Sequence, residues 1–217
     1  TVSISDGTVN VSTSIIGGQA TGSGAVTSNS VAITGGIVTT SGKIIGGYSA
    51  SGPASNNSVT ISGGTINAGG DIVGGQADKG SASGNSVTIS GGSINASIYG
   101  SETFSSGTTA TDNTINICGT ASLSESTRLF GSNWAPSLTV TGNTLNLGYD
   151  GKAASSWQGG RVFSLDNFNT VKYYTLPWSK GSMYLTATSI SNVSNFDFSN
   201  MTLTGTSTMG LGDTMTL

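Results

Sequence analysis

A near-exact internal repeat constrains the fold of this 217-residue chain more than any other feature. Residues 57–67 recur at 85–95 with a single change, Thr65 to Ser93. Four copies start 28 residues apart, a fifth follows 30 residues later, and a decayed copy precedes them. The starts are Asn29, Asn57, Asn85, Asn113 and Asn143, and the decayed copy covers residues 2–11. Repetition at a fixed period of this length is typical of solenoids and propellers.

Each copy predicts three short strands. In the copy that starts at Asn57, Val59 and Ile61 alternate with polar residues, which is the period of a half-buried strand. A Gly-Gly corner leads to a second strand at 65–67, and a third strand ends on another Gly-Gly corner at 74–75. Glycine at these corners is expected to supply positive φ without a steric penalty. A polar loop then leads to the next copy.

The repeat predicts an all-β fold: a single-stranded parallel β-helix, or solenoid, with one copy of about 28 residues per coil. Equivalent residues would then stack about 4.8 Å apart in adjacent coils. The expected interior ladders are Val31, Val59, Val87, Ile115 and Leu145, and Ile33, Ile61, Ile89, Ile117 and Leu147. A propeller or a sandwich is the alternative, but propeller blades are longer and sandwiches lack such regular repetition.

The chain divides into a regular and an irregular part. Residues 1–150 carry the repeats, whereas residues 151–217 are less regular and more aromatic. Segments such as 162–165 still have the pattern of strands, and no linker intervenes. We therefore expect residues 151–217 to continue the same β-helix with longer coils. The tryptophans at 134, 157 and 178 are expected to be core plugs or loop anchors.

Composition excludes several kinds of function. Charged residues make up 8% of the chain against about 25% in average domains, and seven Lys and Arg cannot build a phosphate-neutralising face, so no nucleic-acid partner is expected. The chain has no histidine, which excludes histidine acid–base chemistry and histidine metal sites. No apolar run is long enough for a membrane helix, so this segment is not expected to insert in a membrane. We expect no cofactor and no metal.

The acidic residues are candidates for an enzyme site, because many β-helices are polysaccharide lyases or hydrolases. Such chemistry needs carboxylates clustered on one face, but here they scatter over the repeat. Asp71 follows Lys43 by 28 residues, which predicts a surface ion pair worth at most about 1 kcal/mol. Asp166, Asp197 and Asp213 lie in the irregular part, where a site for acidic polysaccharide is the alternative. Our prediction is that the chain is not an enzyme and has no catalytic residue.

Three residues are the candidate ligand site. Gln19, Tyr48 and Gln76 each follow a Gly-Gly pair, and Glu102 lies near the next equivalent position. Stacked in adjacent coils, they would form an exposed row of amide, aromatic and amide groups that can hold a sugar or a peptide strand. The alternative is a polar ladder whose members satisfy one another across the coils.

The repeat units, Asn-Ser-Val-Thr-Ile-Ser-Gly-Gly-Thr-Ile-Asn followed by Ile-Val-Gly-Gly, resemble those in passenger domains of bacterial autotransporter (type V secreted) adhesins. The stretches 166–178 and 181–186 resemble segments beyond such repeats. The resemblance implies a right-handed β-helix at the cell surface, anchored through an outer-membrane barrel outside this fragment of a longer passenger. It implies attachment to a cell or matrix, with a host or bacterial surface glycan or protein as partner. A non-binding structural spacer is a further alternative.

Overall fold

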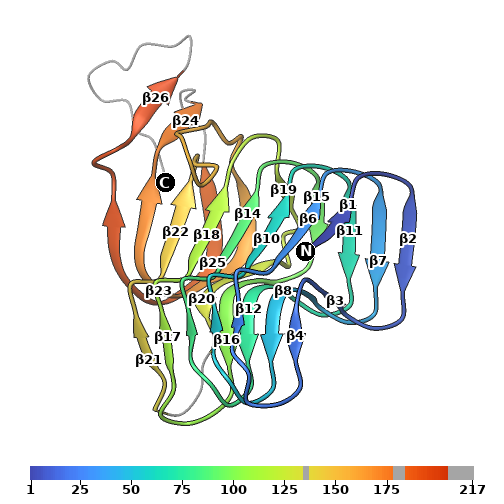
Figure 1. The fold of residues 1–217 in the computed structure, drawn as a ribbon. Helices are drawn as coiled ribbons and strands as arrows, with labels where there is room; N and C mark the ends of the chain where they lie inside the picture. Colours follow the sequence, from blue (N-terminus) through green and yellow to red (C-terminus); the bar gives the residue numbers. More distant parts are fainter. Residues whose placement is uncertain (134–136, 178–183, 205–217) are drawn as a thin grey trace.

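The computed structural model describes residues 1–133, 137–177 and 184–204, whose strands wind into a parallel β-solenoid (Figure 1). The solenoid has about seven turns, with equivalent residues roughly 28 apart and three main strands per coil. The described ranges contain no helix, and thus none long and apolar enough to cross a membrane. The fold class predicted from the repeat is confirmed.

Strands of successive coils align into parallel sheets. The first-strand sheet contains β1 (Val2–Ile4), β6 (Ser30–Ile33), β10 (Ser58–Ile61), β14 (Ser86–Ile89), β18 (Thr114–Ile117) and β22 (Thr144–Leu147). The second-strand sheet contains β2 (Thr8–Val11), β7 (Ile37–Thr40), β11 (Thr65–Ala68), β15 (Ser93–Asn95) and β19 (Ser122–Leu123). The third-strand sheet contains β3 (Ile15–Ile16), β4 (Gln19–Ala20), β8 (Ile44–Ser49), β12 (Ile72–Ala77), β16 (Ile98–Thr103) and β20 (Arg128–Ser132).

The predicted interior ladders form the main core. Val59 lies opposite Val31 and Val87 in the neighbouring coils. Ile61 has the same relation to Ile33 and Ile89, and all members of both ladders are fully buried. Burial of each such side chain stabilises the fold by about 1.5–3 kcal/mol, so the ladders are the main source of cohesion between coils.

The two Gly-Gly pairs of each repeat serve different purposes. At the first pair the prediction of positive φ is correct: Gly64 has a φ of 92°. At the second pair it is wrong, because β12 runs through Gly74 and Gly75 without a left-handed residue. A Cβ added at Gly75 would overlap the side chain of Asn85, and one at Gly74 would crowd the backbone of Ser86. These glycines therefore permit close approach of two chain segments.

This close approach pinches each coil into two lobes. Beyond the pinch, the polar loop of each repeat carries a short strand, and Ala54, Ala77 and Ala82 form a small separate core. Figure 1 shows this alanine lobe below the main coil, with β17 and β21 on one side and β12 and β16 on the other. The short strands are β5 (Val26–Thr27), β9 (Ala54–Ser55), β13 (Ala82–Ser83), β17 (Thr109–Thr111) and β21 (Thr139–Thr141).

The last coils are simpler. Strand β23 (Gly160–Tyr173) pairs with β20 through its first half and with β22 through its second half, which joins the first- and third-strand sheets into one 14-stranded sheet. Residues 167–169 thus replace the whole loop of earlier coils, and the alanine lobe stops at β21. Strand β25 (Leu185–Asp197) pairs along β23, and β24 (Thr175–Pro177) pairs with β26 (Thr202–Thr204).

One predicted core plug is found. Trp157 is fully buried, donates its indole N–H to the carbonyl oxygen of Ala121 at 2.9 Å, and meets the ring of Tyr184 edge-on at 5.3 Å. The other two tryptophans, at 134 and 178, lie outside the described residues.

Candidate functional site

The structure brings the three predicted ligand residues into one row. Gln19 lies opposite Tyr48, Tyr48 opposite Gln76, and Gln76 opposite Glu102, in consecutive coils of the third-strand sheet. Each residue lies just past the pinch, where the glycine pair lets the chain pass from the main coil to the alanine lobe. Their role in binding a ligand remains a prediction.

Asp78 organises this row. Its Oδ2 accepts a hydrogen bond from the hydroxyl of Tyr48 at 2.8 Å, and its Oδ1 accepts one from the Nε2 of Gln76 at 2.8 Å. The bond to Asp78 raises the pKa of Tyr48, with burial and the charge of Asp78 as smaller causes. The row therefore partly satisfies itself, but Oε1 of Gln76 is buried and has no hydrogen-bond partner among the described residues.

A hollow of about 310 Å³ lies beside the row. Ile16 and Ile45 give it aliphatic surface, while Tyr48, Gln76 and Lys43 add hydrogen-bonding groups. A mixed lining of this kind suits a ligand with both apolar faces and hydroxyl groups, as in a sugar ring.

An ion cluster lies next to this hollow. The Nζ of Lys43 lies 3.5 Å from Asp71, as the 28-residue spacing predicted, but only 2.5 Å from Oε2 of Glu102, two coils further on. Glu102 is 3% exposed, and burial raises the pKa of its carboxyl group, while Lys43 opposes this rise. The Nζ also lies 5.6 Å from the ring centroid of Phe104. The contact with Glu102 was missed because it spans two coils.

An aromatic stack extends the same outer face. Tyr99 and Phe130 are in register and stack at 4.4 Å between centroids, with 9° between the ring planes. Burial raises the pKa of Tyr99 well above its ordinary value, and the nearby carboxylates Asp71 and Glu102 add to this rise. The stack fills the positions that Ile45 and Val73 occupy in earlier coils.

The carboxylates of the alternative enzyme site do not form a cluster in the described residues. Asp166 lies opposite Phe130 on one side and Ser191 on the other. Asp197 lies opposite Lys172, six residues further along β25 than Ser191. Asp213 lies outside the described residues. Within the described ranges no group of three or more acidic or thiol side chains could hold a metal ion.

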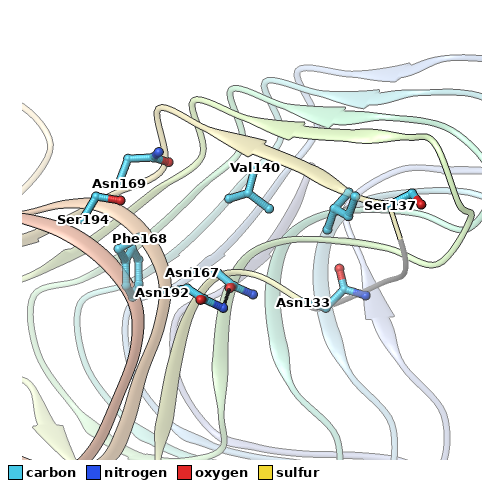
Figure 2. A pocket seen from close by; sticks show the side chains of 9 residues that line it. Asn133, Ser137, Val140, Asn167, Phe168, Asn169, Asn192 and Ser194 are labelled. Atoms are coloured by element: carbon cyan, nitrogen blue, oxygen red, sulfur yellow. Dashed lines mark hydrogen bonds between the residues drawn. The ribbon is translucent and has the colours of Figure 1, made fainter.

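A separate hollow of about 450 Å³ opens where the alanine lobe stops (Figure 2). Figure 2 shows Val140 on one side of it and Asn167 and Asn192 on the other. Nδ2 of Asn192 donates to Oδ1 of Asn167 at 3.0 Å, and Nδ2 of Asn167 donates to the carbonyl oxygen of Ser132 at 2.9 Å. Both asparagines have positive φ, so these amides stabilise the bend that replaces the loop.

The fold and its surfaces define a parallel β-solenoid with polar hollows on its outer faces. The chain has no match among protein-family models, among curated proteins or among solved structures. Its function must therefore be argued from its own surfaces.

Proposed function

We propose that the chain is a rigid, non-catalytic rod of the adhesin kind, displayed at a cell surface as part of an autotransporter-like passenger. It attaches to glycans, or to proteins that carry them, through weak sites spread along its length. The observation that carries this proposal is the row of Gln19, Tyr48 and Gln76 beside a mixed polar and aliphatic hollow.

The rigidity of the rod supports this role. Successive coils are joined by parallel backbone pairing in every sheet, and the interior ladders are fully buried. A stiff scaffold keeps several sites at fixed spacing, so one weak contact raises the effective concentration for the next. Low charge favours uncharged partners, since the chain has few groups to attract an ionic ligand.

The state of the carboxylates favours binding over hydrolysis. Both oxygens of Asp78 accept hydrogen bonds from the candidate row, and Glu102 is engaged by Lys43. A glycosidase instead needs two carboxyl groups facing the same bond at a defined separation. Asp166 on β23 lies opposite Ser191, six residues from Asp197 along β25, so the two carboxylates do not fit that arrangement.

One assay with two readouts tests the proposal. The purified chain is applied to a panel of glycans and cells, and retention is measured while new reducing ends and unsaturated products are followed. We expect retention without products, and Tyr48→Ala should weaken retention about tenfold, a loss of about 1.4 kcal/mol. Ile37→Ala is the control, because Ile37 is exposed on the second-strand sheet.

Two outcomes would overturn the proposal. Product formation that disappears in Asp166→Asn, Asp197→Asn or Asp213→Asn would establish the polysaccharide-cleaving alternative. Absence of both retention and products would favour a spacer.

A further inference from the structure

A further hollow on the solenoid lies away from the predicted row. It measures about 650 Å³ and covers the outer face of the first-strand sheet from β10 to β22. Its floor includes a row of polar side chains in successive coils: Thr60, Thr88, Asn116 and Asn146. Since coils repeat about every 4.8 Å, this row spans on the order of 14 Å along the solenoid axis. We refer to this hollow as the polar trough.

A one-way relay of hydrogen bonds runs along the floor. Nδ2 of Asn146 donates to Oδ1 of Asn116 at 2.8 Å, and Nδ2 of Asn116 donates to Oγ1 of Thr88 at 3.0 Å. The relay uses the amide donors and leaves Oδ1 of Asn146 at its end. Asn146 is 6% exposed, and this oxygen has no hydrogen-bond partner among the described residues. A buried acceptor of this kind is normally satisfied, so Oδ1 of Asn146 can take a hydrogen bond from a water molecule or from a bound molecule that reaches it.

A loop closes one end of the trough. Oδ1 of Asp150 accepts hydrogen bonds from the backbone N–H groups of Lys152 at 2.8 Å and Ala153 at 2.7 Å. These bonds lower the pKa of Asp150 and hold the loop in shape. Gly151 reaches over the relay, where an added Cβ would lie 3.3 Å from Nδ2 of Asn116. Tyr149 lines the trough and stacks on Tyr174 at 4.7 Å.

The trough is therefore open at one end and covered at the other. Thr60 is exposed, Thr88 is half-buried, and Asn116 and Asn146 are buried. A ligand can thus lie along the open part of the row with its end against the loop 149–152, next to Asn146.

The lining selects the kind of ligand. Strands β10, β14 and β18 are paired on both sides, so no free strand edge is available to a peptide. Among the described lining residues only Asp150 and Lys152 are charged, and their charges are opposite. The other floor groups are hydroxyls and amides, which match a chain that presents hydroxyl groups at regular intervals.

We propose that the polar trough binds a neutral, unbranched glycan along the solenoid axis, with a sugar hydroxyl donating to Oδ1 of Asn146. This inference rests on the proposed function and deepens it, because it names a ligand class and a second site on the same rod. The site is distinct from the row of Gln19, Tyr48 and Gln76, which lies on the third-strand sheet.

The test measures binding of the chain to hexasaccharides of cellulose, xylan, mannan and chitin, with polygalacturonate as the acidic comparison. We expect at least one neutral hexasaccharide to bind. Asn146→Leu should weaken that affinity at least tenfold, because it removes the acceptor at similar volume. Ser86→Phe should do the same by filling the trough, and it changes only an outward-facing residue, which keeps the test valid if Asn146→Leu does not fold. Ile37→Ala, at an exposed residue of the second-strand sheet outside both sites, should leave this affinity unchanged.

The outcomes separate this inference from the proposed function. If no neutral hexasaccharide binds, if polygalacturonate binds more tightly, or if folded Asn146→Leu and Ser86→Phe both bind like the wild type, the glycan trough is wrong. If cells retain the chain through Tyr48 but Asn146→Leu and Ser86→Phe do not change hexasaccharide affinity, the adhesin proposal is supported and glycan binding in the trough is contradicted. If hexasaccharides bind through Asn146 but no cell or glycan surface retains the chain, glycan binding in the trough is supported and the adhesin proposal is contradicted.

Discussion

Oδ1 of Asn85 accepts two hydrogen bonds from Asn57, one from its backbone N–H at 3.0 Å and one from its Nδ2 at 3.1 Å. The same Nδ2 of Asn57 also donates to the carbonyl oxygen of Val26 in the preceding coil at 2.9 Å. The two bonds repeat from Asn29 to Asn113, and Asn143 keeps only the bond from its backbone N–H to the next asparagine, so a ladder of asparagines runs through the pinch. The ladder consists of Asn29, Asn57, Asn85, Asn113, Asn143 and Asn169.

Loss of one ladder amide should destabilise the fold. Asn85→Ala leaves the backbone N–H of Asn57 and the carbonyl oxygen of Ala54 without their partners in a buried site. Unsatisfied buried groups cost about 1–3 kcal/mol each, so the free energy of unfolding should fall by about 3 kcal/mol in urea titrations. Asn95→Ala is the matched control, because Asn95 belongs to the same repeat but is exposed. Equal effects of the two changes would contradict the ladder's role.

The second Gly-Gly pair should tolerate no side chain. Gly75→Ala places a Cβ on the amide of Asn85 and should lower the free energy of unfolding by at least about 2 kcal/mol, as overpacking does. Gly22→Ala is the comparison, since nothing lies within 4 Å of a Cβ at that position. It should change stability by less than about 1 kcal/mol. If thermal unfolding showed the two variants to be alike, the pinch would not depend on glycine.

The repeat predicted the coils, the buried ladders and the register of the candidate row because period and alternation report directly on stacking. It did not predict the alanine lobe. A Gly-Gly pair has the same sequence whether it supplies a positive φ, as at Gly64, or close packing, as at Gly75. It also did not predict the partners of the row, because Asp78 and Glu102 meet Tyr48 and Lys43 across coils through long side chains.

Glu102 should make stability depend on pH. Burial raises the pKa of its carboxyl group in the folded state, so the folded protein holds this proton to higher pH than the unfolded chain does. The resulting stabilisation is fully present below the ordinary glutamate pKa of about 4.3 and is lost as pH rises through the raised folded value. Relative to Glu102→Gln, the wild type should therefore lose free energy of unfolding across this interval.

Lys43 provides the internal control for this effect. Its ammonium group lowers the pKa of Glu102 and so partly opposes burial. Lys43→Met should move the loss of stability to higher pH, as measured by urea unfolding at a series of pH values. A wild type that gained stability over Glu102→Gln as pH rose would mean that the ion pair outweighs burial.

Asp78 should set the ionisation of Tyr48. The hydrogen bond from the Tyr48 hydroxyl to Asp78 is the main cause of the raised pKa of that tyrosine. In Asp78→Asn the carboxylate charge is gone, so the tyrosinate is no longer disfavoured by it, and one tyrosine should titrate at lower pH than in the wild type. Ultraviolet difference titration follows this directly. Asp112→Asn, which changes an exposed aspartate of another coil, should leave the tyrosine titration as it is. If both variants titrate like the wild type, Asp78 does not hold Tyr48, and the candidate row loses the contact that orients its aromatic ring.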